Sequence, residues 1–262
     1  MKIIKRILCV SVIAAALAFQ VSCENGSKPK MVRIPGKNYE MMTTEVTQGL
    51  YESVMGENPS YFKKDNEDLD DEKRDNLPKN TKNNPVECVS WYDAIYFCNL
   101  LSKREGLEPV YAVDYETDIS QWNYKPHRGN EIERKITQNV SANGYRLPTV
   151  EEWQYAAKGG KDYAYAGSDN IDKVAWYDEN SGGTTHPAAQ KKANGYGLYD
   201  MSGNVRERCW DVGPFGGSWD RYNCGGSWSD SGYYCGVGYR GYDYADYRYS
   251  SLRFRLVRTL SN

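Results

Sequence analysis

Histidine is scarce in this sequence, and neither sign of charge predominates. The chain of 262 residues has two histidines, too few for a histidine-rich metal centre or a histidine-based proton relay. Its 33 basic and 35 acidic side chains give a net charge of −2 at pH 7, which excludes a nucleic-acid binder that relies on bulk positive charge. The 24 glycines and 10 prolines are too few for a collagen-like or wholly disordered chain. The composition is that of an ordinary globular domain.

A hydrophobic run long enough to span a membrane is also missing. The apolar stretch Ile7 to Phe19 has 13 residues, whereas a spanning helix needs about 20, and no later segment is apolar enough. With the small residues before Cys23, this start resembles a bacterial lipoprotein signal, although Gln20 stands where leucine is usual. We expect residues 1–22 to be a signal peptide, Cys23 to be lipidated and residues 23–30 to form a tether. A plain secretory signal is the alternative, and either one exports the chain.

Cysteine pairing is not decided by the spacing. If Cys9 leaves with the signal and Cys23 carries lipid, five of the seven cysteines remain, an odd number in an oxidising compartment. Cys98 falls on the apolar side of a predicted helix and is expected to be a small buried hydrophobe. One disulfide could form among Cys209, Cys224 and Cys235, in any of three pairings.

Capping residues predict three helices within the first 160 residues. Thr47 precedes a helix that extends to Val54, with Gly56 as its stop signal. Ser90 with Asp93, and Thr149 with Glu152, have the spacing of capping boxes. These boxes begin helices that end at Gly106 and at Gly159–Gly160.

The other segments predict strands and loops. Met31 to Tyr39 is expected to be a strand that enters the domain, and the polar stretch Lys63 to Asn84 to be an exposed loop. Tyr111 to Val140 is interpreted as hairpins and loops, and short strands with glycine-rich turns follow residue 160. The pattern predicts one α+β domain over residues 31–262.

Several blocks occur in the order of a known family. They are Glu45–Thr47, Pro85–Ala94, Tyr145–Ala157, Asn194–Glu207, Gly225–Trp228 and Phe254–Arg255. Together they resemble the formylglycine-generating-enzyme (sulfatase-modifying factor) family, a branch of the C-type lectin fold. The resemblance implies an α+β, C-type lectin fold with few helices, many short strands and a loop-rich C-terminal half. Fold alone does not establish function.

The resemblance also bears on catalysis and metals. Copper-dependent members hold the metal with two cysteines; the second corresponds to Cys235, but Asp230 occupies the first position, and a carboxylate is a poor ligand for Cu(I). Iron-dependent relatives use a histidine cluster, and the two histidines here, His127 and His186, are far apart in the sequence, with no helical or strand spacing. We therefore expect no catalytic residues, no enzymatic activity and no required cofactor. A structural calcium is implied near Asn204 and Glu207, with turn and core roles as the alternative.

The segment Ser229 to Ser251 has an unusual composition. Eighteen of its 23 residues are Tyr, Gly, Ser or Asp, and Lys, Glu, Leu, Ile and Phe are absent. With almost no aliphatic side chain it cannot be mainly core, and so many aromatics are atypical of a disordered tail. Antibody combining loops have a similar composition, because tyrosine supplies rigid contact area and Ser and Gly supply adaptable fit. Its charges sum to −1, which argues against a surface that follows phosphates, and we expect no nucleic-acid partner.

This segment also resembles the variable region of diversity-generating-retroelement proteins of the treponemal lipoprotein type. In that group the residues after Gly-Gly-Ser-Trp are rewritten from a template rich in Asn codons. The resemblance implies that residues 229–251 are a variable ligand-binding segment; Asp220, Tyr222 and Asn223 are candidate extensions of it. The implied binding residues are Ser229, Asp230, Ser231, Tyr233, Tyr234, Tyr239, Gly241, Tyr242, Asp243, Tyr244, Asp246, Tyr247, Tyr249, Ser250 and Ser251.

The leading hypothesis is a surface-displayed lipoprotein that binds ligands non-covalently through this diversified face. Its partner would be a protein or glycan at the cell surface, and its location the bacterial cell envelope, held by the lipid anchor at the outer-membrane surface. Two alternatives remain open. One is a metal-dependent oxidase of the formylglycine-generating family acting on a cysteine peptide, and the other is a carbohydrate-binding lectin of the envelope.

Overall fold

A computed structural model describes residues 28–129, 131–216 and 219–260. The predicted signal peptide, the lipidation at Cys23 and most of the tether lie outside the described residues. Within the described ranges, no helix has both the length and the apolar character needed to cross a membrane.

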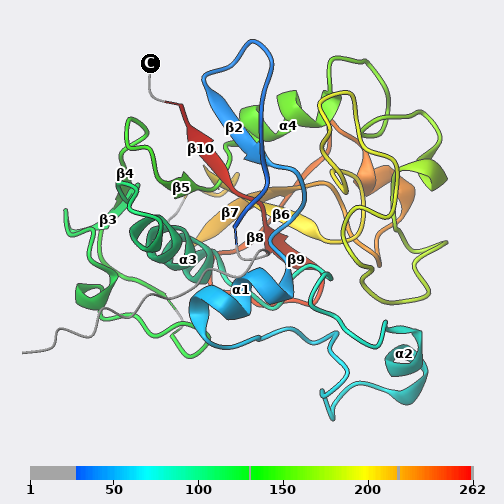
Figure 1. Cartoon of the computed structure of the whole chain (residues 1–262), viewed down its shortest axis with the longest axis horizontal. Coiled ribbons are helices and arrows are strands. Elements are labelled where there is room, and N and C mark those ends of the chain that lie inside the picture. The colour runs from blue at the N-terminus through cyan, green and yellow to red at the C-terminus, as the bar shows by residue number, and fades with distance from the viewer. Residues whose placement is uncertain (1–27, 130, 217–218, 261–262) are drawn as a thin grey trace, which may run out of the picture.

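The two ends of the described chain meet in one antiparallel sheet. Its strand order is β1 (Met31–Arg33), β2 (Tyr39–Met42), β10 (Val257–Thr259) and β5 (Tyr145–Arg146). Figure 1 shows β2 beside β10 near its top. The prediction of one strand over residues 31–39 is wrong in its extent. Gly36, at φ +75°, lies in a turn that divides the segment into a hairpin.

Three helices begin where the capping residues predict. In α1 (Gln48–Met55) the Thr47 side chain accepts the Leu50 N–H, and the chain leaves the helix through Gly56 at φ 81°. Both capping boxes are complete at the starts of α3 (Trp91–Arg104) and α4 (Val150–Lys158). Cys98 is fully buried on α3, as predicted.

The polar stretch Lys63 to Asn84 is not only a loop. It contains α2 (Asp71–Asn76), which Asp70 caps by accepting the Lys73 N–H. Leu69 and Leu77, on either side of α2, are buried together with Phe62. The two leucines thus anchor this mostly polar segment to the domain by packing against Phe62. Two apolar residues among so many charged ones were too weak a pattern to predict α2 from the sequence.

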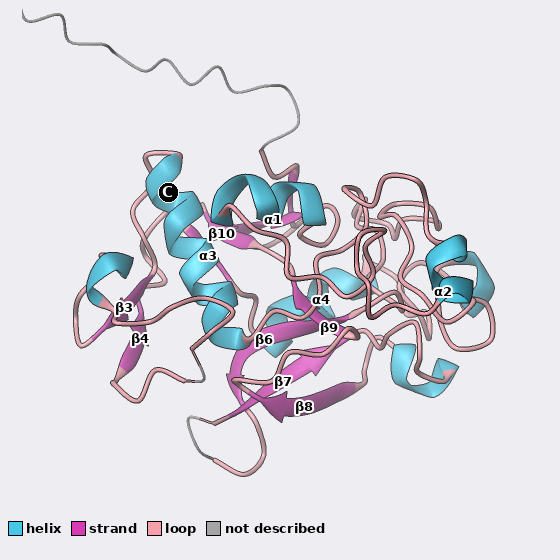
Figure 2. Ribbon diagram, turned by 90° about the horizontal axis from the view of Figure 1, so that it is seen from below, coloured by secondary structure: helices cyan, strands magenta, loops and turns pink. Residues whose placement is uncertain are grey.

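A second sheet forms the C-terminal half of the domain. Its order is β8 (Arg240–Tyr244), β7 (Asp220–Cys224), β6 (Arg206–Val212) and β9 (Leu252–Phe254), with β6 and β9 parallel and the other pairs antiparallel. Figure 2 shows β8 along the free edge of this sheet. A small hairpin, β3 (Tyr111–Val113) with β4 (Ile136–Gln138), lies to one side. The α+β prediction is confirmed.

Two buried arginines link the sheets. Arg255, between β9 and β10, donates from Nε to Glu207 Oε2 (2.9 Å) and from Nη2 to Glu207 Oε1 (2.8 Å). Its remaining N–H groups bond the carbonyls of Met42 (2.8 Å) and Tyr199 (2.7 Å). Arg253 pairs with Glu45 and Glu207. Because all four charged side chains are buried, each depends on its partners for charge balance.

Arg248 fastens the C-terminal segment to the start of α3. Its Nε donates to Asp93 Oδ2 (2.9 Å), and its Nη2 donates to the Tyr124 hydroxyl (3.0 Å) and the Gly129 carbonyl (2.8 Å). Burial by itself raises the pKa of Asp93, but the hydrogen bonds and charge of Arg248 outweigh burial, so this pKa lies below its ordinary value. The tie is therefore charged on both sides at neutral pH.

Replacing Glu207 by alanine is expected to lower the free energy of unfolding by about 3–5 kcal/mol, because Arg253 and Arg255 stay buried without this partner. Chemical denaturation at pH 7 measures the change. The control is Glu40→Ala, which removes the partly exposed Glu40–Arg258 pair and should cost about 1 kcal/mol or less. Similar losses in both variants would contradict a structural role for the buried network.

Arg248→Met is expected to destabilise the protein by about 2–3 kcal/mol at pH 7, somewhat below a fully buried pair because the Arg248 side chain is 21% exposed. Since the folded pKa of Asp93 is depressed, its contribution is present above the unfolded value of 3.8 and is lost as pH falls through the folded value. The difference between variant and wild type should therefore shrink from pH 7 to pH 3. Arg258→Met is the control, and a difference independent of pH would argue against this tie.

Candidate ligand-binding surface

The structure exposes most of the fifteen binding residues expected from the sequence. Eight are exposed, six are half-buried and one is buried. The exposed ones are Ser229, Ser231, Tyr233, Tyr234, Tyr242, Tyr244, Tyr247 and Tyr249; the half-buried ones are Tyr239, Gly241, Asp243, Asp246, Ser250 and Ser251. The inference that this segment cannot be mainly core agrees with its position at the edge of the second sheet and in the loops beside it.

Asp230 is the exception to the expected exposure. Asp230 is only 8% exposed. Its carboxylate pairs with the guanidinium of Arg206, whose Nε lies 2.7 Å from Asp230 Oδ2. Ser227 Oγ donates to the same carboxylate at 2.7 Å. This residue thus holds the turn after Gly225–Trp228 against β6, and its carboxylate is not available at the surface.

Six aromatic side chains form a continuous row across the surface. This row, which we name the aromatic row, consists of Tyr242, Phe215, Trp219, Tyr244, Tyr247 and Tyr249. The ring-centroid distances between neighbours are 6.0 Å for Phe215–Trp219, 5.2 Å for Phe215–Tyr242 and 5.4 Å for Trp219–Tyr244. The row continues through Tyr244–Tyr247 (4.7 Å) and Tyr247–Tyr249 (5.2 Å). Each of the six is between 37% and 62% exposed. Such a contiguous exposed aromatic patch is typical of an interaction site.

A second group, the tyrosine triad, consists of Tyr233, Tyr234 and Tyr239. Their ring centroids lie 4.9–5.7 Å apart, all in edge-on contacts. The short 3-10 turn Gly232–Cys235 carries two of them. Cys235 is buried beneath, and its carbonyl accepts the Ser202 hydroxyl at 2.7 Å. The backbone under the triad is thereby fixed while its rings face outward.

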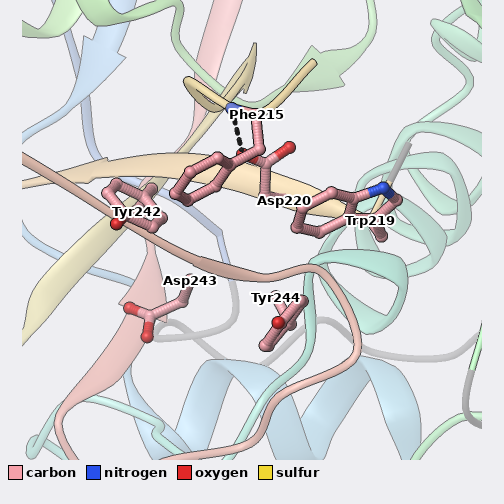
Figure 3. Close-up of a pocket in the computed structure, with 6 residues that line it drawn as sticks. All are labelled: Phe215, Trp219, Asp220, Tyr242, Asp243 and Tyr244. Carbon is pink, nitrogen blue, oxygen red and sulfur yellow. Dashed lines mark hydrogen bonds between the residues drawn. The ribbon is translucent and has the colours of Figure 1, made fainter. Parts of the chain in front are cut away.

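Two pockets open along the aromatic row. The first, of about 250 Å³, is lined by Phe215, Trp219, Asp220, Tyr242, Asp243 and Tyr244. Figure 3 shows the Asp220 carboxylate between Phe215 and Trp219, with a dashed line to the Phe215 N–H (3.1 Å). The second pocket, of about 430 Å³, shares Trp219 and Tyr244 and adds Tyr92, Glu131, Ala245, Asp246 and Tyr247.

The sheet register explains how these side chains converge. Tyr244 lies directly opposite Asp220 on the neighbouring strand, and Tyr242 lies two residues along on the same face. Asp243 points to the other face, where Asn223 Nδ2 donates to it at 2.9 Å. Burial raises the pKa of Asp243, and the charges of Arg208 and Arg206 oppose that rise.

Several pocket residues lie outside the segment singled out in the sequence. These residues come from other parts of the chain: Phe215 and Trp219 lie between β6 and β7, Tyr92 lies on α3, and Glu131 lies before β4. Only the tertiary fold brings them close to Tyr244. Two large aromatics in a glycine-rich turn, Gly213 to Trp219, are the one sequence signal that could have pointed there. Of the suggested extensions, Asp220 and Asn223 are buried; Tyr222 is half-buried, with Arg240 over its ring at 4.9 Å.

The donors at the family's metal positions do not suit a metal. Burial is the main cause that raises the pKa of the Cys235 thiol to about 12, and the negative charge of Asp230 is the second cause. A copper ligand must instead be a thiolate. Asp230 already pairs with Arg206, and both Glu207 oxygens accept from arginine, which leaves Glu207 unsuited to calcium. Asn204 Oδ1, the atom of this side chain that could bind calcium, already accepts the His186 N–H at 3.0 Å. Among the residues described, no group of three or more His, Cys, Asp or Glu side chains could hold a metal ion.

The suggested disulfide among three cysteines is not formed. Cys88, Cys98, Cys209, Cys224 and Cys235 are all free thiols. The sulfurs of Cys209 and Cys224, on β6 and β7, come within 3.9 Å, well beyond the roughly 2.05 Å of a disulfide bond. Burial raises the pKa of the Cys209 thiol, which keeps it in its unreactive protonated form.

Comparisons with known proteins place this architecture. The Sulfatase-modifying factor enzyme 1-like domain matches residues 13–260. The structure of Treponema denticola variable protein 1 superposes with a TM-score of 0.73 and 34% identity, covering 89% of this chain and 92% of that one. The resemblances to this family and to the variable proteins are thereby confirmed, as is the C-type lectin fold of this type.

Two curated proteins are also similar. Chaperone protein LppX of Paenibacillus barcinonensis is 42% identical over 187 residues, which is 64% of this chain and 60% of LppX. The formylglycine-generating enzyme of Mycobacterium tuberculosis is 40% identical over 78 residues, 24% of this chain and 26% of the enzyme. Relatives of this fold therefore include an enzyme as well as a variable protein. From its sequence blocks, its paired sheets and these matches, the chain belongs to the Sulfatase-modifying factor enzyme 1-like domain family.

Proposed function

We propose that this chain is a ligand-binding protein of the bacterial envelope, which recognises a protein or glycan non-covalently through the aromatic row and the tyrosine triad. The observation that carries the proposal is the aromatic row itself: six contiguous rings, each more than a third exposed, on the edge strand β8 and the segments beside it. Folding alone does not require such a patch, because it leaves apolar surface in water. Tyrosine and tryptophan are the residues that most often anchor interfaces.

The attachment of the segment supports diversification of its side chains. β8 is held by backbone pairing with β7. The buried residues Asp230 and Cys235 and the half-buried Arg248 fix the chain between the exposed positions. Substitutions at exposed positions therefore leave these ties intact and should each change stability by about 0.5 kcal/mol or less. The similarity to a Treponema denticola variable protein supports the same interpretation.

The proposal includes a lipid anchor at Cys23 and no catalytic step. The lipoprotein-like start of the sequence supports export and anchoring, with the binding domain carried at the outer-membrane surface. A non-enzymatic role is supported by the Asp230–Arg206 pair, which occupies one of the two ligand positions of the copper-dependent relatives. No required cofactor or nucleic-acid partner is included, because the two pockets along the aromatic row carry acidic and no basic side chains.

A five-residue variant, with Tyr233, Tyr242, Tyr244, Tyr247 and Tyr249 changed to serine, should keep the fold but lose binding. Protein and glycan arrays probed with wild type and variant measure this. Each lost anchor is expected to cost about 1–2 kcal/mol, so ligands of the wild type should bind at least about tenfold more weakly. The matched control changes Tyr115 and Tyr163, which are 82% and 38% exposed and lie outside the two aromatic groups. Binding that survives in the five-residue variant, or is lost in the control, would refute the proposed surface.

Diversification has a separate genomic test. The gene should lie near a reverse transcriptase and a near-repeat of its own Gly225 to Arg258 coding region, with Asn codons at the exposed positions. Sequencing of independent isolates should find substitutions at Tyr242 and Tyr244 and none at Cys235 or Arg248. Substitutions spread evenly over residues 31–258 would contradict a targeted mechanism.

A further inference from the structure

The first pocket has a feature that the aromatic row alone does not explain. Asp220, at its base, is 1% exposed, and its two carboxylate oxygens are used unequally. Oδ2 accepts the Phe215 N–H and so caps the loop between β6 and β7. Oδ1 is buried and has no hydrogen-bond donor anywhere in the described part of the chain. A buried carboxylate oxygen without a partner is costly and calls for a ligand or a role.

The loop is shaped to keep this carboxylate in place. A Cβ at Gly213 would come within 2.4 Å of Asp220 Oδ2, so only glycine leaves room for the side chain there. Asp220 Oδ2 accepts the Phe215 N–H, so this backbone donor already has its hydrogen-bond partner. Oδ1 has no donor among the described residues, and Asp220 lines the pocket, so a donor that enters there and displaces the carboxylate slightly would satisfy this oxygen.

The walls of the pocket favour a cation. Phe215, Trp219, Tyr242 and Tyr244 surround the base, and aromatic faces attract ammonium groups through their quadrupoles. The residues that line this pocket and its neighbour include no lysine or arginine, and three of them, Asp220, Glu131 and Asp246, carry carboxylates. The Asp243 carboxylate belongs to the opposite face of β8, where it accepts from Asn223. An entering anion would meet repulsion, and a neutral group would leave Asp220 Oδ1 without a charged partner.

The nearest arginines do not fill this role. The Arg221 guanidinium lies 4.0 Å from the Trp91 ring centroid and donates to the Trp210 carbonyl. Its side chain starts from the face of β7 opposite to Asp220, because neighbouring strand residues alternate. Arg206 is paired with Asp230, and Arg208 bonds the carbonyls of Val89 and Tyr247. These three guanidinium groups are thus engaged elsewhere. Arg240, two residues before Tyr242 on β8, lies over the Tyr222 ring and is not among the residues that line the pocket.

The volume sets the size of the group. About 250 Å³ corresponds to roughly eight waters at about 30 Å³ each, which is below the roughly 300–1,000 Å³ of sites that enclose a whole small-molecule ligand. One long side chain fits better than a complete metabolite. The geometry points to a pocket for the alkylammonium end of a lysine side chain on a protein ligand, held by Asp220 Oδ1 and the four surrounding rings. This inference rests on the proposed function and specifies the ligand chemistry of the same surface.

The test uses the full chain and Nα-acetyl-L-lysine methylamide as probe, with the uncharged norleucine and Nε-acetyl-lysine analogues for comparison. Ligand-observed NMR titration measures each affinity. The lysine probe should bind about five- to tenfold more tightly than either analogue, and this preference should fall as salt is raised. Asp220→Asn, which keeps the shape and can still accept the Phe215 N–H, should abolish the preference.

Two further variants make the outcome decisive. Trp219→Leu removes one wall at an exposed position and should weaken the lysine probe while denaturation shows an intact fold. The matched control is Asp71→Asn on α2, whose side chain is 92% exposed and remote in the fold; it should leave binding unchanged. Equal affinity for lysine and norleucine probes, or an unchanged preference in Asp220→Asn, overturns the inference. If the lysine preference is absent but the five-residue variant described above still loses its array ligands, the proposed function stands without a lysine pocket.

Discussion

The buried pairing of Arg253 and Arg255 with Glu45 and Glu207 is the interaction on which the rest of this structure depends. These side chains sit where the two sheets approach each other, and Arg255 also bonds carbonyls of β2 and of the loop at Tyr199. Separating one member of such a buried network from its partners is strongly destabilising, so the network opposes arrangements of the sheets that pull these side chains apart. The stiffness of β6, and of β7 and β8 beyond it, follows from this constraint.

That stiffness separates structural from displayed positions along one short segment. Between residues 229 and 251 the side chains that bond inward are few, namely Asp230, Asp243 and Arg248, together with Cys235, Val237 and Ala245 in the core. The others project from a backbone whose path they do not determine. An interchangeable surface is physically possible only under this condition, because a side chain that also specifies the fold cannot vary freely.

The family shows how one framework can support different chemistry. In this chain a buried thiol, Cys235, and the Asp230–Arg206 ion pair lie close to the turn that follows Gly225–Trp228. Function in this fold is therefore argued from the residues at the site rather than from the framework. Here the site residues are phenol, indole and carboxylate groups, which suit recognition by contact area, π-faces and charge.

The sequence by itself determined the helix starts, the α+β class and the segment that faces solvent. Capping boxes act within four residues, and a segment without aliphatic side chains cannot enter a core, so both are legible locally. It did not predict α2, because the leucines on either side of that helix lie among charged residues. It also expected Asp230 to be exposed, because the partner of that side chain, Arg206, is 24 residues away in the sequence. Only the tertiary structure decided that Phe215, Trp219 and Asp220 join Tyr242 and Tyr244 in one pocket. The reason is that strand register and loop closure bring together groups whose proximity no local pattern records.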